Sequence, residues 1–101
     1  MQNAGGAPLS DYRLFETEEF RRKLVKLPAV DAKFIRTKLL RYIYPQLRKN
    51  PYFGPNIKKL VGYKPPTWRY RISRFRIFYL VDESERIVFI LTINVRKDAY
   101  K

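Results

Sequence analysis

The feature that most constrains the fold is the alternation of apolar and polar residues that fills the second half of the chain. Three runs with a period of two follow one another, at residues 68–73, 75–81 and 86–94. Such alternation is typical of β-strands, whose successive side chains point to opposite faces of a sheet. The polar run at residues 82–85 predicts a tight turn between the last two strands. Residues 87–93 are almost entirely apolar and predict a central strand.

The first half of the chain has a helical period instead. Apolar residues recur every three or four positions over residues 17–27, which predicts a first helix that Pro28 ends. Lys23 and the other basic residues of this helix are expected to point mostly outward. A second helix is predicted over residues 29–47, and Pro45 is expected to kink it or to end it early.

Two short segments complete the predicted sheet. Residues 12–15 predict a first strand before the helices, and residues 57–61 a linker or a short edge strand. The order of elements predicts an α+β fold, with two N-terminal helices packed on a twisted, mainly antiparallel sheet of about four strands. With 101 residues, 46% of them hydrophobic, the chain has the size of one domain. We expect this domain at residues 11–101, after a flexible tail at residues 1–10.

Composition excludes several kinds of chemistry. The chain has neither cysteine nor histidine, which removes disulfides, thiolate nucleophiles, imidazole bases and nearly every zinc site. It has no glycine-rich phosphate loop and no paired aspartates of a two-metal nuclease, so we expect no metal, no cofactor and no small-molecule ligand. No apolar stretch approaches the roughly 20 residues of a membrane span, and the first residues lack a signal pattern. A cytoplasmic protein without membrane contacts is therefore expected.

The net charge of +13 is concentrated in the middle of the chain. Residues 32–81 contain 13 basic and no acidic residues, whereas the remainder has nine of each. A run of charge is often only a solvated face, but here the cations lack carboxylate partners nearby in the sequence. We therefore predict that the segment binds a polyanion, with RNA as the first candidate. The candidate RNA-binding residues are Lys33, Arg36, Lys38, Arg41, Lys58, Lys59 and Arg74.

The densest basic cluster lies in the string WRYRISRFR at residues 68–76. Alternation places Arg69 and Arg71 on one face and the aromatic residues of that strand on the other. Two guanidinium groups about 7 Å apart along a strand match successive phosphates, which arginine grips in a bidentate manner. Arg76 begins the next strand and can join them. The alternative is an ordinary amphipathic strand with solvated arginines.

The last eight residues, NVRKDAYK, directly follow the predicted central strand. The end of this strand can place Arg96 beside the other arginines and bring the phenol of Tyr100 to the same place. Asp98 is the one carboxylate near this group in the sequence, and it can orient Arg96. A frayed tail is the alternative.

Five strings in this order resemble the RelE/ParE family of bacterial and archaeal toxins. They are FRRKLVKLP at 20–28, IKKLVG at 57–62, RYRI and FRIFY within 69–79, and RKDAY at 96–100. The resemblance extends over residues 11–101. It implies a compact α+β toxin that cleaves messenger RNA, typically on the ribosome, and that an antitoxin neutralises. The expected partners are thus an acidic antitoxin protein, messenger RNA and the ribosome with its RNA.

The resemblance also implies roles for five residues. Arg69 and Arg71 match a pair of basic catalytic residues, and Arg76 matches an arginine that stabilises the transition state. Arg96 corresponds to the candidate general acid, and Tyr100 to a terminal tyrosine that we take as the candidate base. Arg69 and Arg71 stand where the best-known member has lysines, and Ser73-Arg74 replaces the usual Gly-Asp turn.

These residues lead to two hypotheses. The first is a metal-independent endoribonuclease, in which a ribose 2′-hydroxyl attacks the adjacent phosphate and the arginines stabilise the negative charge that develops. The second is a toxin without catalytic activity, which resembles the ParE branch and inhibits DNA gyrase, or a basic module that binds RNA or protein. The ParE branch usually lacks the full set of arginines and tyrosine, which favours the first hypothesis.

Overall fold

The structure, a computed structural model, describes residues 11–95. The predicted tail at residues 1–10, as well as Arg96 and Tyr100, lies outside the described residues. The elements follow in the order β1 (Arg13–Glu16), α2 (Glu18–Lys26), α3 (Ala29–Lys38), η1 (Leu39–Ile43), α4 (Tyr44–Lys49), β2 (Ile57–Lys59), β3 (Trp68–Ile72), β4 (Phe75–Asp82) and β5 (Ile87–Val95). No helix in this part of the chain is long and apolar enough to cross a membrane.

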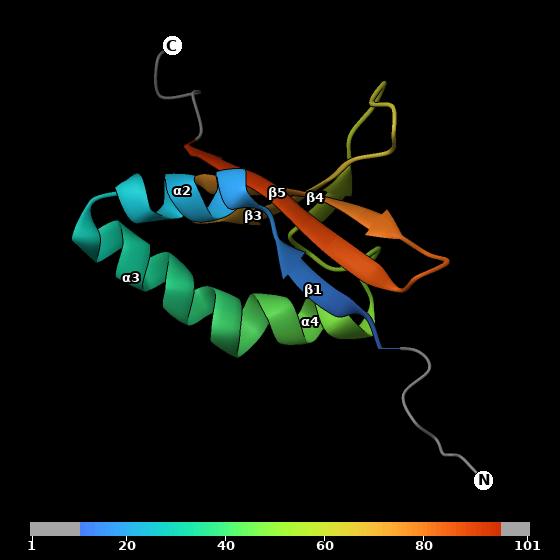
Figure 1. Cartoon of the computed structure of the whole chain (residues 1–101), viewed down its shortest axis with the longest axis horizontal. Helices are drawn as coiled ribbons and strands as arrows, with labels where there is room; N and C mark the ends of the chain where they lie inside the picture. Colours follow the sequence, from blue (N-terminus) through green and yellow to red (C-terminus); the bar gives the residue numbers. More distant parts are fainter. Residues whose placement is uncertain (1–10, 96–101) are drawn as a thin grey trace, which may run out of the picture.

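The sheet has five strands in the order β1-β5-β4-β3-β2, and it is mixed rather than antiparallel throughout. β1 runs parallel to β5, whereas every other neighbouring pair is antiparallel. The α+β prediction is confirmed, but its estimate of about four strands is wrong by one. Residues 57–59 form the edge strand β2, and β1 closes the opposite edge beside β5 (Figure 1).

The core lies between the helices and one face of the sheet. Phe75, Ile77 and Tyr79 of β4 are buried on that face, and Phe20 and Leu24 are buried on α2. Figure 1 shows α3, η1 and α4 as one continuous, bent helix beside the sheet, with α2 folded back from its first end. The other face of the sheet, which we call the open face, has no helix over it, so its side chains decide what the molecule can contact.

Thr17 fixes the start of α2 against the sheet. Its hydroxyl accepts a hydrogen bond from the N–H of Phe20 (3.2 Å) and donates one to the carbonyl of Leu91 in β5 (2.8 Å). A threonine at this position satisfies an N–H that the helix leaves unpaired. This cap confirms the predicted start of the helix and anchors α2 along the edge of β5.

The prediction for Pro45 is confirmed in one of its two forms: the second helix does not end early, but α3 and α4 run in different directions on the two sides of η1 (Figure 1). The chain stays helical from Ala29 to Lys49, and the five residues of η1 form a wider, π-helical turn. Proline has no N–H to donate, and its ring crowds the carbonyl four residues earlier. In the wider turn the N–H of Tyr44 instead bonds to the carbonyl of Leu39, five residues back, so the helix continues past the proline.

The turns between β3, β4 and β5 set the register of the sheet. Ser73, in the turn between β3 and β4, has a positive φ of 54°. The turn after β4 is the predicted acidic one, in which the Asp82 carboxylate accepts hydrogen bonds from the Ser84 hydroxyl and the Glu85 N–H. A bulge at Phe78/Tyr79 leaves Leu91 as an extra residue in β5.

Candidate nucleic-acid interface

The register between β3 and β4 places three arginines on the open face. Arg71 lies directly opposite Arg76, and Arg69 lies opposite Phe78. Their neighbours Tyr70 and Ile77 are also paired, and both are buried in the core on the other side. Because successive side chains alternate, the three guanidinium groups share the face that the helices leave uncovered. We refer to Arg69, Arg71 and Arg76 as the arginine face.

This arrangement concentrates positive charge. Directly opposite residues of an antiparallel pair have Cβ atoms about 4.5–5.5 Å apart, and like charges in that position repel each other. The Nε atom of Arg76 is moreover buried and makes no hydrogen bond within residues 11–95. A buried donor without an acceptor is costly, and an anion bound on this face relieves the repulsion between the paired arginines.

Lys23 is a further cation beside the arginine face, and the sequence prediction for it was wrong. Its ammonium group donates to the Thr92 hydroxyl (3.0 Å) and to the side-chain oxygen of Asn94 (2.8 Å), both on β5. Asn94 lies opposite Arg76 in the sheet. Lys23 therefore reaches from α2 around the edge of β5 instead of pointing outward. The signal in the sequence was its position three residues after Phe20 and four before Leu27, beside the apolar stripe.

Two of the candidate RNA-binding arginines have carboxylate partners that lie far away in the sequence. Arg74 forms an ion pair with Asp31 (2.9 Å), and Arg36 forms one with Glu16 (2.9 Å). The inference that the acid-free segment leaves its cations without partners is therefore wrong for these two residues. Glu16 also accepts a hydrogen bond from the buried Tyr44 hydroxyl, which makes this cluster part of the link between β1 and the long helix.

The remaining candidate lysines and arginine fall on three different surfaces. Lys58 lies opposite Arg69 and extends the arginine face to the edge of the sheet, whereas Lys59 lies over the Trp68 ring (5.8 Å from its centroid). Lys33, Lys38 and Arg41 belong to the long helix on the other side of the core. The Lys38 ammonium lies 4.9 Å from the centroid of the exposed Tyr42 ring. The structure thus brings Lys58 to the arginines, and of the helical cations it brings Lys38 into one hollow with Arg71 (about 520 Å³).

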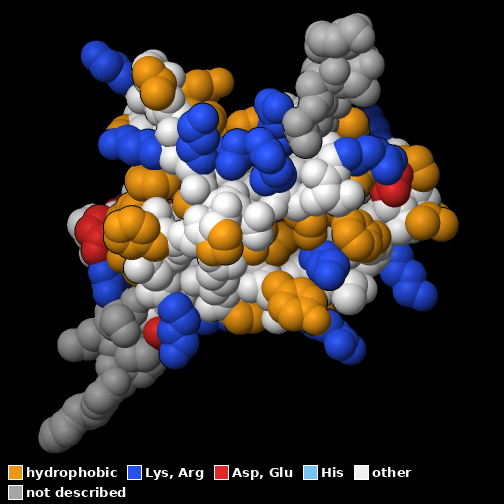
Figure 2. Space-filling view, turned by 180° about the vertical axis from the view of Figure 1, so that it is seen from behind, with side chains coloured by type: hydrophobic (Ala, Val, Ile, Leu, Met, Phe, Trp, Pro, Cys, Tyr) orange, Lys and Arg blue, Asp and Glu red, His pale blue; other side chains and the backbone are white. Residues whose placement is uncertain are grey.

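The open face is apolar beyond the arginines. Along β4 the outward residues after Arg76 are Phe78 and Leu80, and Leu80 pairs with Phe89 of β5. Phe15 of β1 contacts Phe89 (ring centroids 5.7 Å apart) although 54% of its surface is exposed. Figure 2 shows the resulting pattern, a band of Lys and Arg side chains that crosses the molecule with hydrophobic side chains alongside it.

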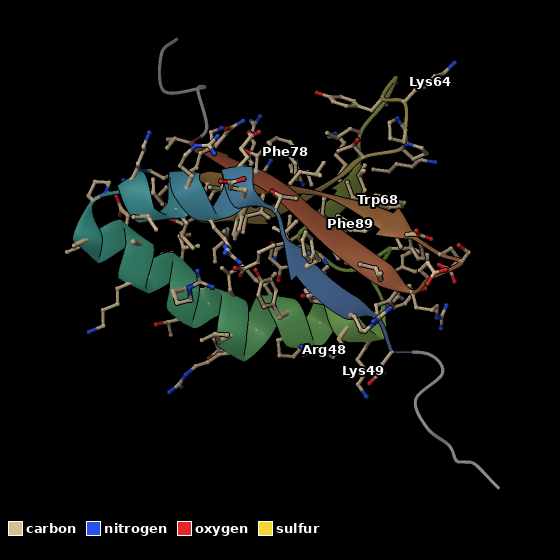
Figure 3. All side chains as sticks on the ribbon, viewed as in Figure 1. Arg48, Lys49, Lys64, Trp68, Phe78 and Phe89 are labelled. Carbon is tan, nitrogen blue, oxygen red and sulfur yellow. The ribbon has the colours of Figure 1, made fainter. Side chains whose placement is uncertain are left out.

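Phe78 marks the open face in Figure 3, while Arg48 and Lys49 lie at the end of α4 on the opposite side of the molecule. These two exposed cations thus belong to the helical layer. The molecule therefore carries basic residues on both sides, and apolar side chains accompany them on both: Phe34 and Tyr42 lie beside Lys38 in the helical layer, and Phe15, Phe78 and Leu80 lie on the open face.

Five of the described tyrosines donate hydrogen bonds through their hydroxyl groups. Tyr12 and Tyr52 both donate to the Glu83 carboxylate (2.9 and 2.6 Å), and burial together with this carboxylate raises the pKa of both phenols. The same bonds lower the pKa of Glu83. Burial also raises the pKa of Tyr79, whose hydroxyl donates to the carbonyl of Pro51. These phenols therefore stay protonated at neutral pH. In residues 11–95 no group of three or more acidic side chains could hold a metal ion.

The family follows from comparison with known proteins. The family model of the ParE toxin of type II toxin–antitoxin systems (parDE) matches residues 14–100. The chain therefore belongs to the ParE toxin family, within the RelE/ParE superfamily, and is the toxin of a toxin–antitoxin system. A search among curated proteins gives no match.

Solved structures show the same fold. The Mycobacterium tuberculosis toxin–antitoxin complex RelBE2 contains a chain that is 24% identical, with a TM-score of 0.69 over 89% of this chain and 97% of that one. The isolated E. coli RelE toxin is 22% identical, with a TM-score of 0.64 over 88% of this chain and 90% of that one. The YoeB/ParE toxin from Agrobacterium tumefaciens is 16% identical, with a TM-score of 0.65 over 84% and 99%. At these identities the similarity establishes the fold alone.

Proposed function

We propose that this toxin is an endoribonuclease that cleaves messenger RNA on the ribosome without a metal ion. The observation that carries the proposal is the position of Arg69, Arg71 and Arg76 on one uncovered sheet face. Three guanidinium groups there provide fork-shaped donors for phosphate oxygens.

The reaction that fits these groups begins within the RNA itself. The ribose 2′-oxygen bonds to the adjacent phosphorus, and the bond from phosphorus to the 5′-oxygen of the next nucleotide breaks. The products are a cyclic 2′,3′-phosphate and a 5′-hydroxyl. Negative charge builds on the phosphorane oxygens, and the arginine face stabilises that charge more than it stabilises the ground state.

The proton transfers are assigned to residues beyond the described part of the chain. Tyr100 is the proposed base that takes the proton of the 2′-hydroxyl, and Arg96 is proposed to neutralise the leaving 5′-oxygen. Arg69 and Arg71 are permanent cations and therefore serve for binding and charge stabilisation rather than for proton removal. A site with this division of roles depends on accurate positioning of its substrate, which the ribosome can provide.

An acidic antitoxin is the proposed protein partner. The net charge of +13 favours a negatively charged protein that covers the cationic surfaces. Structures with the same fold include toxin–antitoxin complexes, among them RelBE2 from Mycobacterium tuberculosis and RelE–RelB from Pyrococcus horikoshii.

A second candidate function is inhibition of DNA gyrase without RNA cleavage. The observation that favours it is the match of the ParE family model to residues 14–100. The two candidates differ in what the arginine face does: a nuclease requires it for cleavage, whereas a gyrase inhibitor acts without cutting RNA.

The deciding experiment compares the wild-type toxin with Arg76→Ala and Tyr100→Phe after induction in cells. We expect wild-type protein to produce new 5′ ends within translated messenger RNA, and each substitution to abolish them. Arg48→Ala, on the opposite side of the molecule, is the matched control and should cleave normally. If growth stops while messenger RNA stays intact, and purified toxin blocks supercoiling by gyrase, the second candidate is correct. Cleavage of single-stranded DNA, which lacks the 2′-hydroxyl, contradicts the proposed mechanism.

A further inference from the structure

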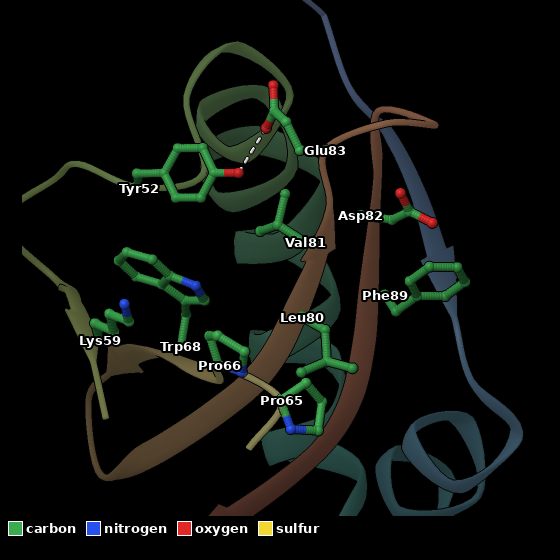
Figure 4. Close-up of a pocket in the computed structure, with 10 residues that line it drawn as sticks. All are labelled: Tyr52, Lys59, Pro65, Pro66, Trp68, Leu80, Val81, Asp82, Glu83 and Phe89. Carbon is green, nitrogen blue, oxygen red and sulfur yellow. Dashed lines mark hydrogen bonds between the residues drawn. The ribbon is translucent and has the colours of Figure 1, made fainter. Parts of the chain in front are cut away.

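A hollow lies at the end of the sheet where β4 extends beyond β3. The last pair between these strands is Trp68 with Tyr79, so Leu80 to Asp82 have no neighbouring strand on that side within the described residues. The hollow that results has a volume of about 570 Å³. Figure 4 shows it between Trp68 and Tyr52 on one side and Leu80 and the proline pair Pro65-Pro66 on the other.

The walls of this hollow are flat, apolar and held in place. Pro65 and Pro66 belong to the loop between β2 and β3, whose ends are joined by a hydrogen bond from the Leu60 N–H to the Thr67 carbonyl (2.9 Å). The Thr67 hydroxyl, on a buried residue, donates to the Pro65 carbonyl (3.0 Å). Rigid proline and aromatic walls lose little conformational freedom when a ligand enters, so they suit a flat ligand.

Polar groups stand at the rim of the hollow. At one end lies the Asp82 carboxylate, which Ser84 and Glu85 hold through Oδ1. At another side lies the Lys59 ammonium, over the Trp68 ring. This combination of flat apolar walls, a carboxylate and an ammonium group matches a ligand of one kind. Such a ligand is a planar group with apolar faces and amino groups on its edge, attached to a phosphate. A carboxylate accepts hydrogen bonds from base amino groups, and aromatic side chains pack against base faces.

The hollow meets the arginine face along β4. Trp68 and Lys59 lie on the helix side of the sheet, because they pair with each other and Trp68 pairs with the buried Tyr79, whereas Leu80 shares the open face with Arg76. Along β4, Leu80 lies four residues after Arg76, a distance of about 13 Å for an extended strand. A single RNA strand whose phosphate contacts Arg76 can therefore reach the hollow within a few nucleotides.

We propose that this hollow binds a nucleobase of the same RNA strand whose phosphate the arginine face contacts. The inference rests on the proposed function, because it requires single-stranded RNA on the open face. An extended peptide fits less well, because the free edge of β4 offers only the segment from Leu80 to Asp82 for strand pairing. The cation Lys59 in the lining of the hollow also attracts phosphates.

The chain contains one tryptophan, so Trp68 reports on the hollow by its own fluorescence. The probe is a short single-stranded RNA with 2′-O-methyl groups, which cannot supply the attacking hydroxyl, and a terminal dye that gives the total binding by anisotropy. We expect binding and a change in Trp68 emission together. The same strand with all bases removed at the nucleotides beside the central phosphate should bind about 5- to 100-fold more weakly and leave the emission unchanged. Oligo-aspartate, a polyanion without bases, should also leave it unchanged.

A pair of matched variants tests the site directly. Leu80→Ala removes part of the wall of the hollow and should weaken binding of the methylated RNA about fivefold or more, without changing binding of the abasic strand. Leu40→Ala, at a position that is 61% exposed on η1, removes the same atoms from the helical layer and should change neither affinity. Thermal unfolding of both variants checks that they are folded.

Each outcome separates the inference from the function on which it rests. If the methylated RNA binds by anisotropy but Trp68 emission stays constant, the hollow holds no base and the inference is overturned, while the proposed function stands. If the abasic strand or oligo-aspartate changes the Trp68 emission as much as the methylated RNA does, the inference is overturned as well. If folded wild-type protein binds the RNA by neither readout, both proposals are wrong.

Discussion

Replacement of Arg76 by alanine should change how RNA binding depends on salt. Each phosphate that a protein neutralises on a single strand contributes about −0.7 to the slope of log K against log salt. If each arginine of the arginine face contacts one phosphate, the three residues give a slope of about −2.1. Affinity for a short RNA should then fall about 18-fold between about 50 and 200 mM salt. With two contacts left in Arg76→Ala, the fall should be only about sevenfold.

The measurement is a series of anisotropy titrations with the uncleavable 2′-O-methyl RNA at several salt concentrations. Arg48→Ala is the matched control, because it removes the same charge from an exposed position at the end of α4. Its slope should equal that of the wild type. If both variants reduce the slope by the same amount, the RNA responds to net charge alone and the geometric argument for the arginine face is refuted. An unchanged slope for Arg76→Ala refutes it as well.

Three further predictions concern stability. Ser73→Gly should raise the free energy of unfolding by up to about 1 kcal/mol, because the relief of strain at the positive φ of 54° exceeds the loss of backbone entropy that glycine brings. Ser73→Val should lower the free energy of unfolding. Denaturant titration measures both changes. Glu16→Ala should cost about 1–3 kcal/mol, since it leaves the buried Tyr44 hydroxyl without its acceptor, and Tyr44→Phe in the same background should cost less than the sum of the single changes. The folded state raises the pKa of Tyr44 and Tyr79 above their ordinary value of 10.0, so it holds protons that the unfolded chain releases. The free energy of unfolding should therefore be constant between neutral pH and about pH 10 and fall above it, with a smaller fall in Tyr44→Phe. A stability that does not change between neutral pH and strongly alkaline pH contradicts the last prediction.

Local patterns in the sequence were sufficient for much of the fold. The period of two over residues 68–94 gave β3, β4 and β5 with their turns to within about one residue, because in a meander each strand pairs with the next one in the chain. The parallel pairing of β1 with β5 was not predictable in this way. It joins residues more than seventy positions apart, such as Arg13 and Ile87, and no local period encodes that contact. The π-helical turn before Pro45 was missed for a different reason, since sequence rules describe what proline breaks rather than how a helix widens around it.

The candidate site was likewise predictable from the sequence only in part. Alternation predicted that Arg69 and Arg71 share a face, and the short turn at Ser73 brought Arg76 opposite Arg71. The contact between Lys23 and Asn94 depends on how α2 packs against β5, which is a tertiary property. The ion pairs of Arg74 and Arg36 were likewise invisible, because their carboxylates come from segments that are distant in the sequence but adjacent in space.

The central place of β5 in the sheet delays the moment at which a newly made toxin can act on the cell that makes it. β5 is synthesised after all the other strands, yet it lies between β1 and β4. Until β5 emerges from the ribosome, β1 has no strand to pair with and α2 has no strand to pack against. Long-range pairings of this kind form late, since the chain must close a large loop before any contact compensates for the lost entropy. A nascent or prematurely terminated chain is thus expected to stay unfolded and inactive. A neutralising partner therefore has the whole period of synthesis in which to be made before the toxin is active.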